Sequence, residues 1–196
     1  MKVLIIFAHP NPNSFCAAIK ANVESGLKDA SHQVKIHDLY EDQFDPILSK
    51  EELLETQLAS ENPRIKQYQQ DLLWAKIIII IHPAWWYGPP AILKGYFDRV
   101  LEPGFAHEYV NDQPIPQLTD KKGILIQTFD STEKMEKEVL GNVTYKTIVN
   151  TWKYCGITEW KRFAMFRILF STETQRKEWL QEAYLLGKEL EKKKWH

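Results

Sequence analysis

The sequence has few of the residues that mark secreted, metal-binding or nucleic-acid-binding proteins. Its 196 residues include two cysteines, Cys16 and Cys155, too few for a disulfide scaffold and without the paired spacing of a metal site. Basic residues are not in excess, because 25 Lys and Arg stand against 26 Asp and Glu, so no positive field is available to bind nucleic acid. We expect reduced thiols, a cytoplasmic location, no bound metal and no nucleic-acid partner.

Long apolar segments and glycine-rich phosphate loops are also missing. The apolar start at residues 3–8 is too short for the core of a signal peptide, and no run reaches the roughly 20 residues of a membrane span. The 8 glycines form neither G-x-G-x-x-G nor a Walker lysine motif, which argues against a Rossmann dinucleotide site or a nucleoside triphosphatase. The length suits one soluble α/β domain over residues 1–196.

Five successive isoleucines at residues 77–81 are the strongest structural signal. A β-branched run without polar alternation is typical of a strand that is buried on both faces, as in the interior of a parallel sheet. Pro89 and Pro90 follow it and can open a helix, since proline is tolerated in the first turn. The sheet therefore needs helices on both sides.

Strands and helices alternate along the rest of the chain. We predict strands at residues 2–8, 33–39, 77–81, 122–128 and 158–165, and helices at 14–29, 49–60, 63–74, 90–101, 140–154 and 172–194, with a Gly/Pro-rich excursion at 102–118. This pattern predicts a flavodoxin-like five-stranded parallel sheet in the order 2-1-3-4-5, with helices on both faces. In this fold the ligand cleft lies at the carboxyl ends of the first, third and fourth strands.

The turn from His9 to Phe15 joins the first strand to the first helix. Ser14 is a predicted N-cap, and the amides that open a helix carry partial positive charge and point outward. With His9 and Asn13 as further donors, the turn is suited to a diphosphate. The alternative is an ordinary capped helix start in which His9 bonds the backbone.

Three adjacent aromatics, Trp85, Trp86 and Tyr87, lie on a Pro/Gly-bounded turn after the isoleucine strand. Three such side chains cannot all enter one core, which favours a shelf for a planar ligand; interface or core packing is the alternative. Lys94 and Asp98 have the spacing of a structural i,i+4 salt bridge, and Arg99 is also taken as structural.

Two side chains of the excursion, His107 and Tyr109, could donate hydrogen bonds to a substrate carbonyl. The alternative interpretation is that both residues belong to a solvated surface loop. The remaining histidines, His32, His37 and His196, are predicted to be at the surface, except for His82, which ends its strand. Cys16 lacks a basic partner in the sequence, so we do not expect a catalytic thiol.

Three segments together resemble the flavodoxin-like NAD(P)H:quinone oxidoreductases, the family that includes the DT-diaphorases and the bacterial modulator-of-drug-activity reductases. They are residues 3–10 with Ser14 and Phe15, residues 38–40 with 44–47, and residues 83–100, of which the last is the most specific. The similarity extends over residues 1–110 and then weakens.

The resemblance implies a bound flavin, FAD with FMN as the alternative, and NAD(P)H as co-substrate. NAD(P)H and a quinone take turns on one flavin face in this family, so no second nucleotide domain is needed and kinetics are ping-pong. It further implies a homodimer with pockets at the subunit interface, in which His107 or Tyr109 orients the acceptor; the two align with family aromatics of the quinone pocket, and only Tyr109 keeps the residue type. The implied cofactor residues are His9, Asn13, Ser14, Phe15, Ala18, Pro83, Ala84, Trp85, Trp86, Tyr87, Thr128, Phe129 and Asp130.

Two departures from the family pattern concern the fourth strand. Phe129 and Asp130 stand where the family commonly has two glycines, and the Tyr and His of the family's next loop have no secure counterpart at residues 130–145. A flavin-dependent quinone reductase is the leading hypothesis. The alternatives are a flavin-binding electron carrier or regulatory subunit with little turnover, and a flavin-free interaction module that uses the Trp patch.

Overall fold

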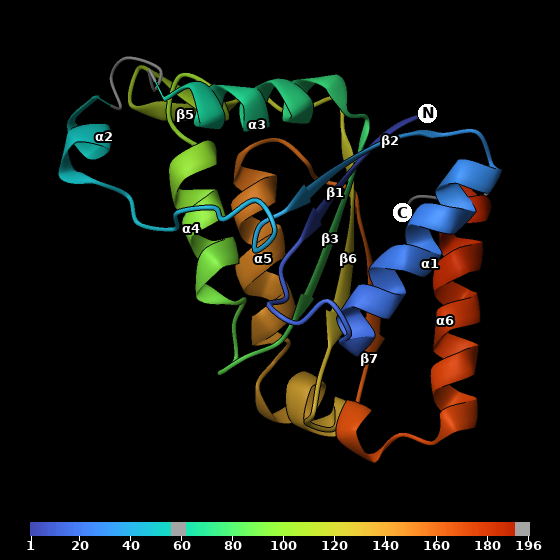
Figure 1. The fold of residues 1–196 in the computed structure, drawn as a ribbon. Coiled ribbons are helices and arrows are strands. Elements are labelled where there is room, and N and C mark those ends of the chain that lie inside the picture. Colours follow the sequence, from blue (N-terminus) through green and yellow to red (C-terminus); the bar gives the residue numbers. More distant parts are fainter. Residues whose placement is uncertain (56–61, 191–196) are drawn as a thin grey trace.

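The computed structural model describes residues 1–55 and 62–190 of the chain (Figure 1). Its main sheet is formed by β1 (Lys2–Phe7), β2 (Gln33–Asp38), β3 (Ile77–Pro83), β6 (Lys122–Thr128) and β7 (Trp160–Met165). The strand order is β2-β1-β3-β6-β7, and every pairing is parallel. Because β6 and β7 are the fourth and fifth strands of this sheet, the predicted order 2-1-3-4-5 is confirmed.

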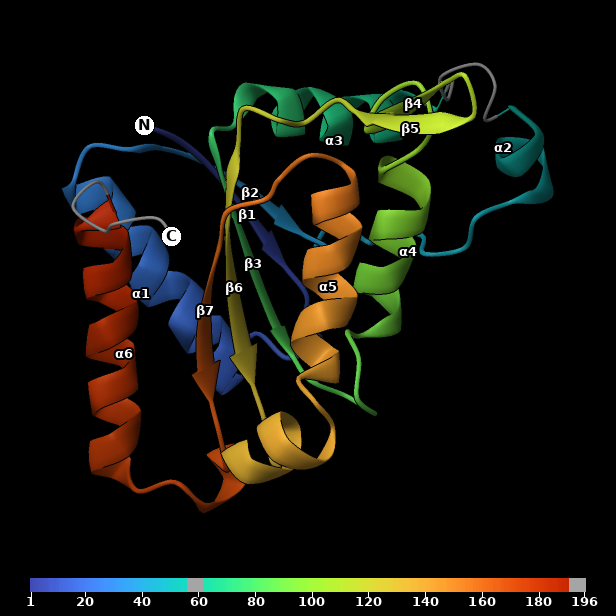
Figure 2. The same ribbon diagram turned by 180° about the vertical axis from the view of Figure 1, so that it is seen from behind.

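Helices cover both faces of the sheet (Figures 1 and 2). On one face lie α1 (Phe15–Asp29) and α6 (Glu173–Lys188), and on the other lie α3 (Pro63–Trp74), α4 (Ala91–Val100) and α5 (Val143–Tyr154). Successive side chains of β3 alternate between the two layers: Ile79 packs with α1 and α6, whereas Ile78 and Ile80 pack with the helices opposite. The isoleucine run is therefore apolar throughout because both of its faces are buried.

Hydrogen bonds from side chains define the helix starts that the sequence predicted. Ser14 Oγ accepts from Ala17 N at 3.2 Å, and Thr172 with Gln175 forms a capping box at the start of α6. A second capping box opens α2 (Lys50–Glu55), where Ser49 N donates to Glu52 Oε2 at 3.2 Å. Three parts of the predictions lie outside the described residues: positions 56–60 of the helix predicted at 49–60, positions 191–194 of the helix predicted at 172–194, and His196.

The excursion at residues 102–118 contains a two-stranded hairpin that was not predicted. It consists of β4 (His107–Val110) and β5 (Gln113–Pro116), joined through Asn111 and Asp112, whose φ angles are 50° and 60°. Two successive positive φ angles are what a type I′ hairpin turn requires. The sequence did not predict β5 because it has proline at alternate positions. Proline cannot donate a hydrogen bond to a neighbouring strand, so it is found mainly in edge strands.

The fifth helix starts later than predicted. It begins at Val143 rather than at residue 140, and a π-helical turn, Met135–Val139, precedes it. Single π turns of this kind are uncommon and are often found at functional sites.

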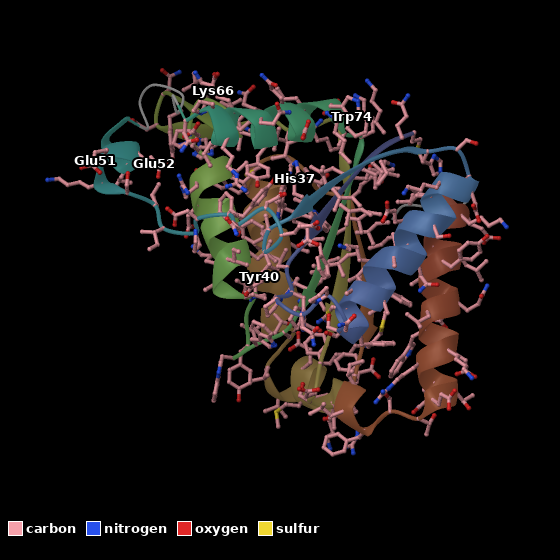
Figure 3. The ribbon with its side chains drawn as sticks, in the orientation of Figure 1. His37, Tyr40, Glu51, Glu52, Lys66 and Trp74 are labelled. Atoms are coloured by element: carbon pink, nitrogen blue, oxygen red, sulfur yellow. The ribbon has the colours of Figure 1, made fainter. Side chains whose placement is uncertain are left out.

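The prediction that His32 and His37 lie at the surface is wrong. His37 is 3% exposed and lies between β2 and helices α3 and α4 (Figure 3), with Nδ1 3.0 Å from Tyr96 Oη and Nε2 3.2 Å from the Asp71 carboxylate. Burial lowers the pKa of His37, so the ring is a neutral core group. His32 is also buried, 2.8 Å from the amino terminus of Met1.

Close contact between α1 and α6 depends on two glycines, Gly26 and Gly187. A Cβ at Gly26 would lie 2.0 Å from the backbone oxygen of Tyr184, and a Cβ at Gly187 would lie 2.4 Å from that of Val23. Distances this short leave room for hydrogen only. The two helices can therefore approach closely enough to close the core on this face.

We expect Gly26→Ala to destabilise the protein by about 1–3 kcal/mol, the usual cost of overpacking. Helix propensity alone would favour alanine by roughly 1 kcal/mol, so a net loss identifies the steric clash. Ser25→Ala, at the exposed neighbouring position, is the matched control. The free energy of unfolding from urea titration measures both, and equal stability of the two variants would contradict the packing described here.

Candidate functional site

Three segments that are far apart in the sequence meet at the carboxyl edge of the sheet. The rings of His9 and Trp85 lie edge to face with centroids 5.8 Å apart, and Ala84 N donates to Thr128 O at 2.9 Å. Cys16 Sγ lies 3.0 Å from Thr128 Oγ1, across 112 residues of sequence. The His9 turn, the aromatic turn and the end of β6 thus form one continuous surface.

Two adjoining cavities run along this surface. The first, the His9 cavity, has a volume of about 170 Å³, and the second, the Trp86 cavity, has a volume of about 190 Å³; both are lined by Ala84, Phe129 and Asp130. The other residues of the His9 cavity are His9, Phe15, Cys16, Pro83, Trp85, Thr128, Ile168 and Leu169. Those of the Trp86 cavity are Trp86, Tyr87, Ser131, Glu136, Leu140 and Thr144. We call the two cavities together the slot.

The start of α1 presents hydrogen-bond donors to the His9 cavity. Its first-turn amides have no acceptor within the helix and lie at the positive end of the helix dipole. His9 Nδ1 accepts from Asn11 N at 3.0 Å, which leaves the ring proton on Nε2. Burial lowers the pKa of His9, so the ring is neutral at pH 7. Asn13 is exposed beside it, while Ser14 and Ala18 are partly buried.

The aromatic turn is a strained backbone segment. Trp85 and Gly88 exchange two backbone hydrogen bonds of 3.0 Å, and between them Trp86 and Tyr87 have φ angles of 49° and 65°. Bulky residues rarely adopt this left-handed conformation, which costs of the order of 1–2 kcal/mol for each. Trp86 is 94% exposed and Tyr87 is 59% exposed, so the prediction that these rings do not all enter the core is confirmed.

The side chain of Phe129 lies beneath the slot. It is buried, and its ring stacks on Phe166 with centroids 4.8 Å apart and planes inclined by 24°. Asp130, the next residue, is exposed at the rim. The chain therefore keeps the slot open although it has a bulky residue where glycine is common in the resembling family.

Sequence reasoning missed a buried ion pair at the end of the Trp86 cavity. Arg162 of β7 donates from Nη2 to Glu136 Oε1 at 2.9 Å, and Thr144 donates to the same oxygen. Glu136 is 1% exposed, and it lies in the π-helical turn. The one available signal was an arginine inside a strand of a buried sheet, since such a charge needs a partner.

The structure does not bring His107 and Tyr109 into the slot of their own chain. Helix α4 carries the chain away from the aromatic turn over 10 residues, about 15 Å, to the opposite edge of the sheet, where β4 and β5 lie (Figures 1 and 2). There the His107 ring contacts those of Tyr109 and Tyr154, at 5.4 and 5.0 Å between centroids. His107 also lines a separate cavity of about 450 Å³ with Phe97 and Leu101.

Other charged and nucleophilic candidates have structural roles. Burial raises the pKa of Cys16 to about 11 and that of Cys155 to about 12, and both thiols are free, so neither has the depressed pKa of a nucleophile. Lys94 pairs with Asp98 as predicted, while Arg99 ties α4 to Glu52 of α2.

Within residues 1–55 and 62–190, three or more potential metal ligands do not cluster anywhere. In the same part of the chain, each helix is too short or too polar to cross a membrane.

A doubly wound parallel sheet with its cavities at the carboxyl edge defines the flavodoxin-like class of α/β proteins. A family model described as the flavodoxin-like fold matches residues 1–185, and the chain belongs to this family. Its relatives there include NAD(P)H oxidoreductases of the quinone reductase type, which confirms the resemblance seen in the sequence.

Individual comparisons agree with this assignment. An uncharacterized NAD(P)H oxidoreductase of Haemophilus influenzae is 39% identical over 160 residues, which cover 80% of this chain and 79% of that protein. NAD(P)H dehydrogenase (quinone) 1 of Cavia porcellus is 32% identical over 151 residues, 68% of this chain, and the match spans about half, 55%, of that longer protein. The solved structure of Smu.1420 from Streptococcus mutans superposes with a TM-score of 0.87 at 31% identity, covering 96% of this chain and 99% of that one.

Proposed function

We propose that the protein is a flavin-dependent NAD(P)H:quinone oxidoreductase. The observation that carries the proposal is the meeting of the α1 start, the strained aromatic turn and Thr128 along one slot. The donors fit a phosphate group and the exposed rings fit a planar heterocycle, which are the two halves of a flavin cofactor. When bound, the flavin supplies a hydride acceptor that NAD(P)H reduces and a quinone reoxidises, two electrons at a time.

The His9 turn would bind the phosphates of the cofactor. Nε2–H of His9 and the free amides of Phe15 and Cys16 are donors. Asn13 and Ser14 lie in the same turn, and Ala18 follows in α1. Preformed donors at a helix start bind an anion without paying for their own reorganisation. We propose FAD, following the family resemblance, and the same donors would serve FMN.

The aromatic turn and the end of β6 would hold the ring. Pro83, Ala84 and Trp85 would line the slot beside Thr128, Phe129 and Asp130, and the exposed rings of Trp86 and Tyr87 would lie at its mouth. Cys16 fixes the hydroxyl of Thr128 through its 3.0 Å contact. Trp86 and Tyr87 would also exclude water from the reacting face, which strengthens the electrostatic interactions there.

Both substrates would use the same exposed side of the slot in turn. The described residues hold no glycine-rich nucleotide motif that would bind NAD(P)H at a second site. This supports ping-pong kinetics, in which the oxidised nicotinamide leaves before the quinone enters. We also propose a reducing, cytoplasmic compartment, where Cys16 and Cys155 would stay thiols.

A homodimer would bring His107 and Tyr109 to the acceptor. In one chain they lie at the edge opposite the slot, so they can act there only if a second copy places its β4–β5 hairpin against it. The hairpin exposes apolar side chains suited to an interface: Tyr109 is 61% exposed, Val110 50% and Ile115 42%. We therefore propose that Tyr109, which is exposed, or His107, which is buried behind it, orients the acceptor across the interface.

Purified protein is expected to be yellow, to bind FAD or FMN with a micromolar or lower Kd, and to oxidise NAD(P)H with menadione in steady state. The absorbance spectrum and chromatography of the released cofactor identify the flavin. Flavin binding with negligible turnover would support the electron carrier instead. Protein that binds neither flavin at micromolar concentration would falsify the proposal and leave the interaction module.

Flavin affinity is expected to rise as the pH is lowered. Burial keeps the pKa of His9 below 6.5 in the free protein, and a bound diphosphate favours the imidazolium, so binding takes up a proton. The gain in flavin affinity is fully present below the pKa that His9 has in the free protein. It is lost as the pH rises through the higher pKa that His9 has in the complex. Fluorescence titration between about pH 5.5 and about pH 8 measures it. His9→Gln and riboflavin, which has no phosphate, should each give a flat profile; a slope in both would rule out His9 as the cause.

Two inactive variants should restore activity when they are combined in one dimer. Ser14→Asp keeps a capping side chain but repels a diphosphate, and Tyr109→Ala removes the hairpin group. A heterodimer purified by two tags would contain one intact slot facing one intact hairpin, and should regain half of the wild-type turnover. If each chain forms its site alone, every site in the heterodimer is damaged and no activity returns.

A further inference from the structure

The carboxylate of Glu136 has one saturated and one free oxygen at the wall of the Trp86 cavity. Oε1 accepts from Arg162 Nη2 and from Thr144 Oγ1. Oε2 accepts no hydrogen bond within the described part of the chain, and Glu136 is one of the residues that line the cavity. A carboxylate oxygen that no protein donor occupies is available to a donor on a ligand in the cavity.

Arg162 holds this carboxylate in a fixed position. Its Nε donates to Gln127 Oε1 at 3.1 Å and its Nη1 to Asn142 Oδ1 at 2.8 Å. The guanidinium also lies over the rings of Phe129 and Tyr145, at 5.5 and 5.2 Å from their centroids. Anchored from β6, β7 and the start of α5, the pair cannot swing out to solvent, and its charges are paired.

The shape and chemistry of the cavity indicate which donor would meet Oε2. Trp86, Tyr87 and Phe129 line the cavity with aromatic surface, which suits a flat ring, and Glu136 presents one acceptor at its polar end. The pyrimidine edge of an isoalloxazine has a single N–H, at N3, between two carbonyl groups. A carboxylate oxygen accepts such an N–H in a charge-assisted hydrogen bond.

We propose that Glu136 Oε2 accepts the hydrogen bond of flavin N3–H, and that Arg162 is the positioning residue that holds Glu136 for it. The inference rests on the proposed flavin site and assigns the ring edge within it. This contact selects rings that carry a donor at that edge. It also places a carboxylate next to the ring, where it opposes the extra negative charge of reduction and lowers the reduction potential.

The test combines a protein variant with a flavin analogue. Apoprotein is titrated with FAD and with 3-methyl-FAD, which lacks the N3 donor, for the wild type, Glu136→Gln and the exposed control Glu138→Gln. In the wild type and in Glu138→Gln, methylation should weaken binding about tenfold or more, the effect of losing a hydrogen bond to a charged group. In Glu136→Gln, FAD itself should bind about tenfold more weakly and the methylation penalty should shrink, because the charge-assisted bond is already gone. Steric effects of the methyl group cancel when the wild type and Glu136→Gln are compared, since glutamine has the size of glutamate.

The reduction potential of the bound flavin provides a readout that does not depend on turnover. It should be more positive in Glu136→Gln than in the wild type and unchanged in Glu138→Gln. An equal methylation penalty in the wild type and Glu136→Gln, or equal potentials, overturns the assignment. If Glu136→Gln does not fold, the wild type alone decides: equal affinity for FAD and 3-methyl-FAD overturns the inference and leaves the proposed function in place, whereas wild-type protein that binds no flavin overturns both.

Discussion

The parallel pairing of β3 with β1 and β6 is the constraint on which the rest of the structure depends. Phe7 is paired with Ile81 and Pro83 with Thr128, so the three strands end at almost the same level. Parallel strands in register must deliver their following turns to one edge. The His9 turn, the aromatic turn and residues 128–130 therefore meet there, although they are far apart in the sequence.

Rigidity of the sheet is what permits strain and buried charge at its edge. Ile77–Pro83 is buried along its whole length, with apolar helices on both faces. Burying such side chains contributes roughly 1.5–3 kcal/mol each, which offsets two left-handed aromatic residues and one ion pair with a free oxygen. Two of the residues with a positive φ angle, Trp86 and Tyr87, line the Trp86 cavity together with the buried Glu136. Such departures from local rules are expected at functional sites because the surrounding structure must hold them in place.

The β4–β5 hairpin shows why a family resemblance has to be mapped residue by residue onto a structure. His107 and Tyr109 stand near the slot in the order of the sequence, only a helix beyond the aromatic turn. That helix reverses the chain direction relative to the strand, and the hairpin emerges at the other edge. A role for these residues in the proposed reaction thus becomes a statement about two chains, and oligomerisation becomes part of the mechanism rather than an addition to it.

Short-range signals in the sequence were sufficient for the sheet and most helices. The isoleucine run, the capping residues Ser14, Ser49 and Thr172, and the proline that opens α3 act within one or two turns of the chain, so their effect can be predicted without the fold. The same holds for the three segments of the slot, because strand order follows from the alternation of elements. The exposure of Trp86 and Tyr87 was also predictable, because three adjacent aromatic side chains on one turn cannot all enter the core.

Only the tertiary structure decided the contacts between groups with no local relation. His37 occupies a polar position in the alternating pattern of β2, which predicted a surface side chain. In the structure α3 and α4 cover it and supply Asp71 and Tyr96 as partners. Arg162 and Glu136 are 26 residues apart and meet because β7 lies beside β6, and the π-helical turn follows β6 in the chain. Local sequence specifies backbone conformation through steric and hydrogen-bonding rules of short range, whereas the partner of a buried charge depends on how whole elements pack.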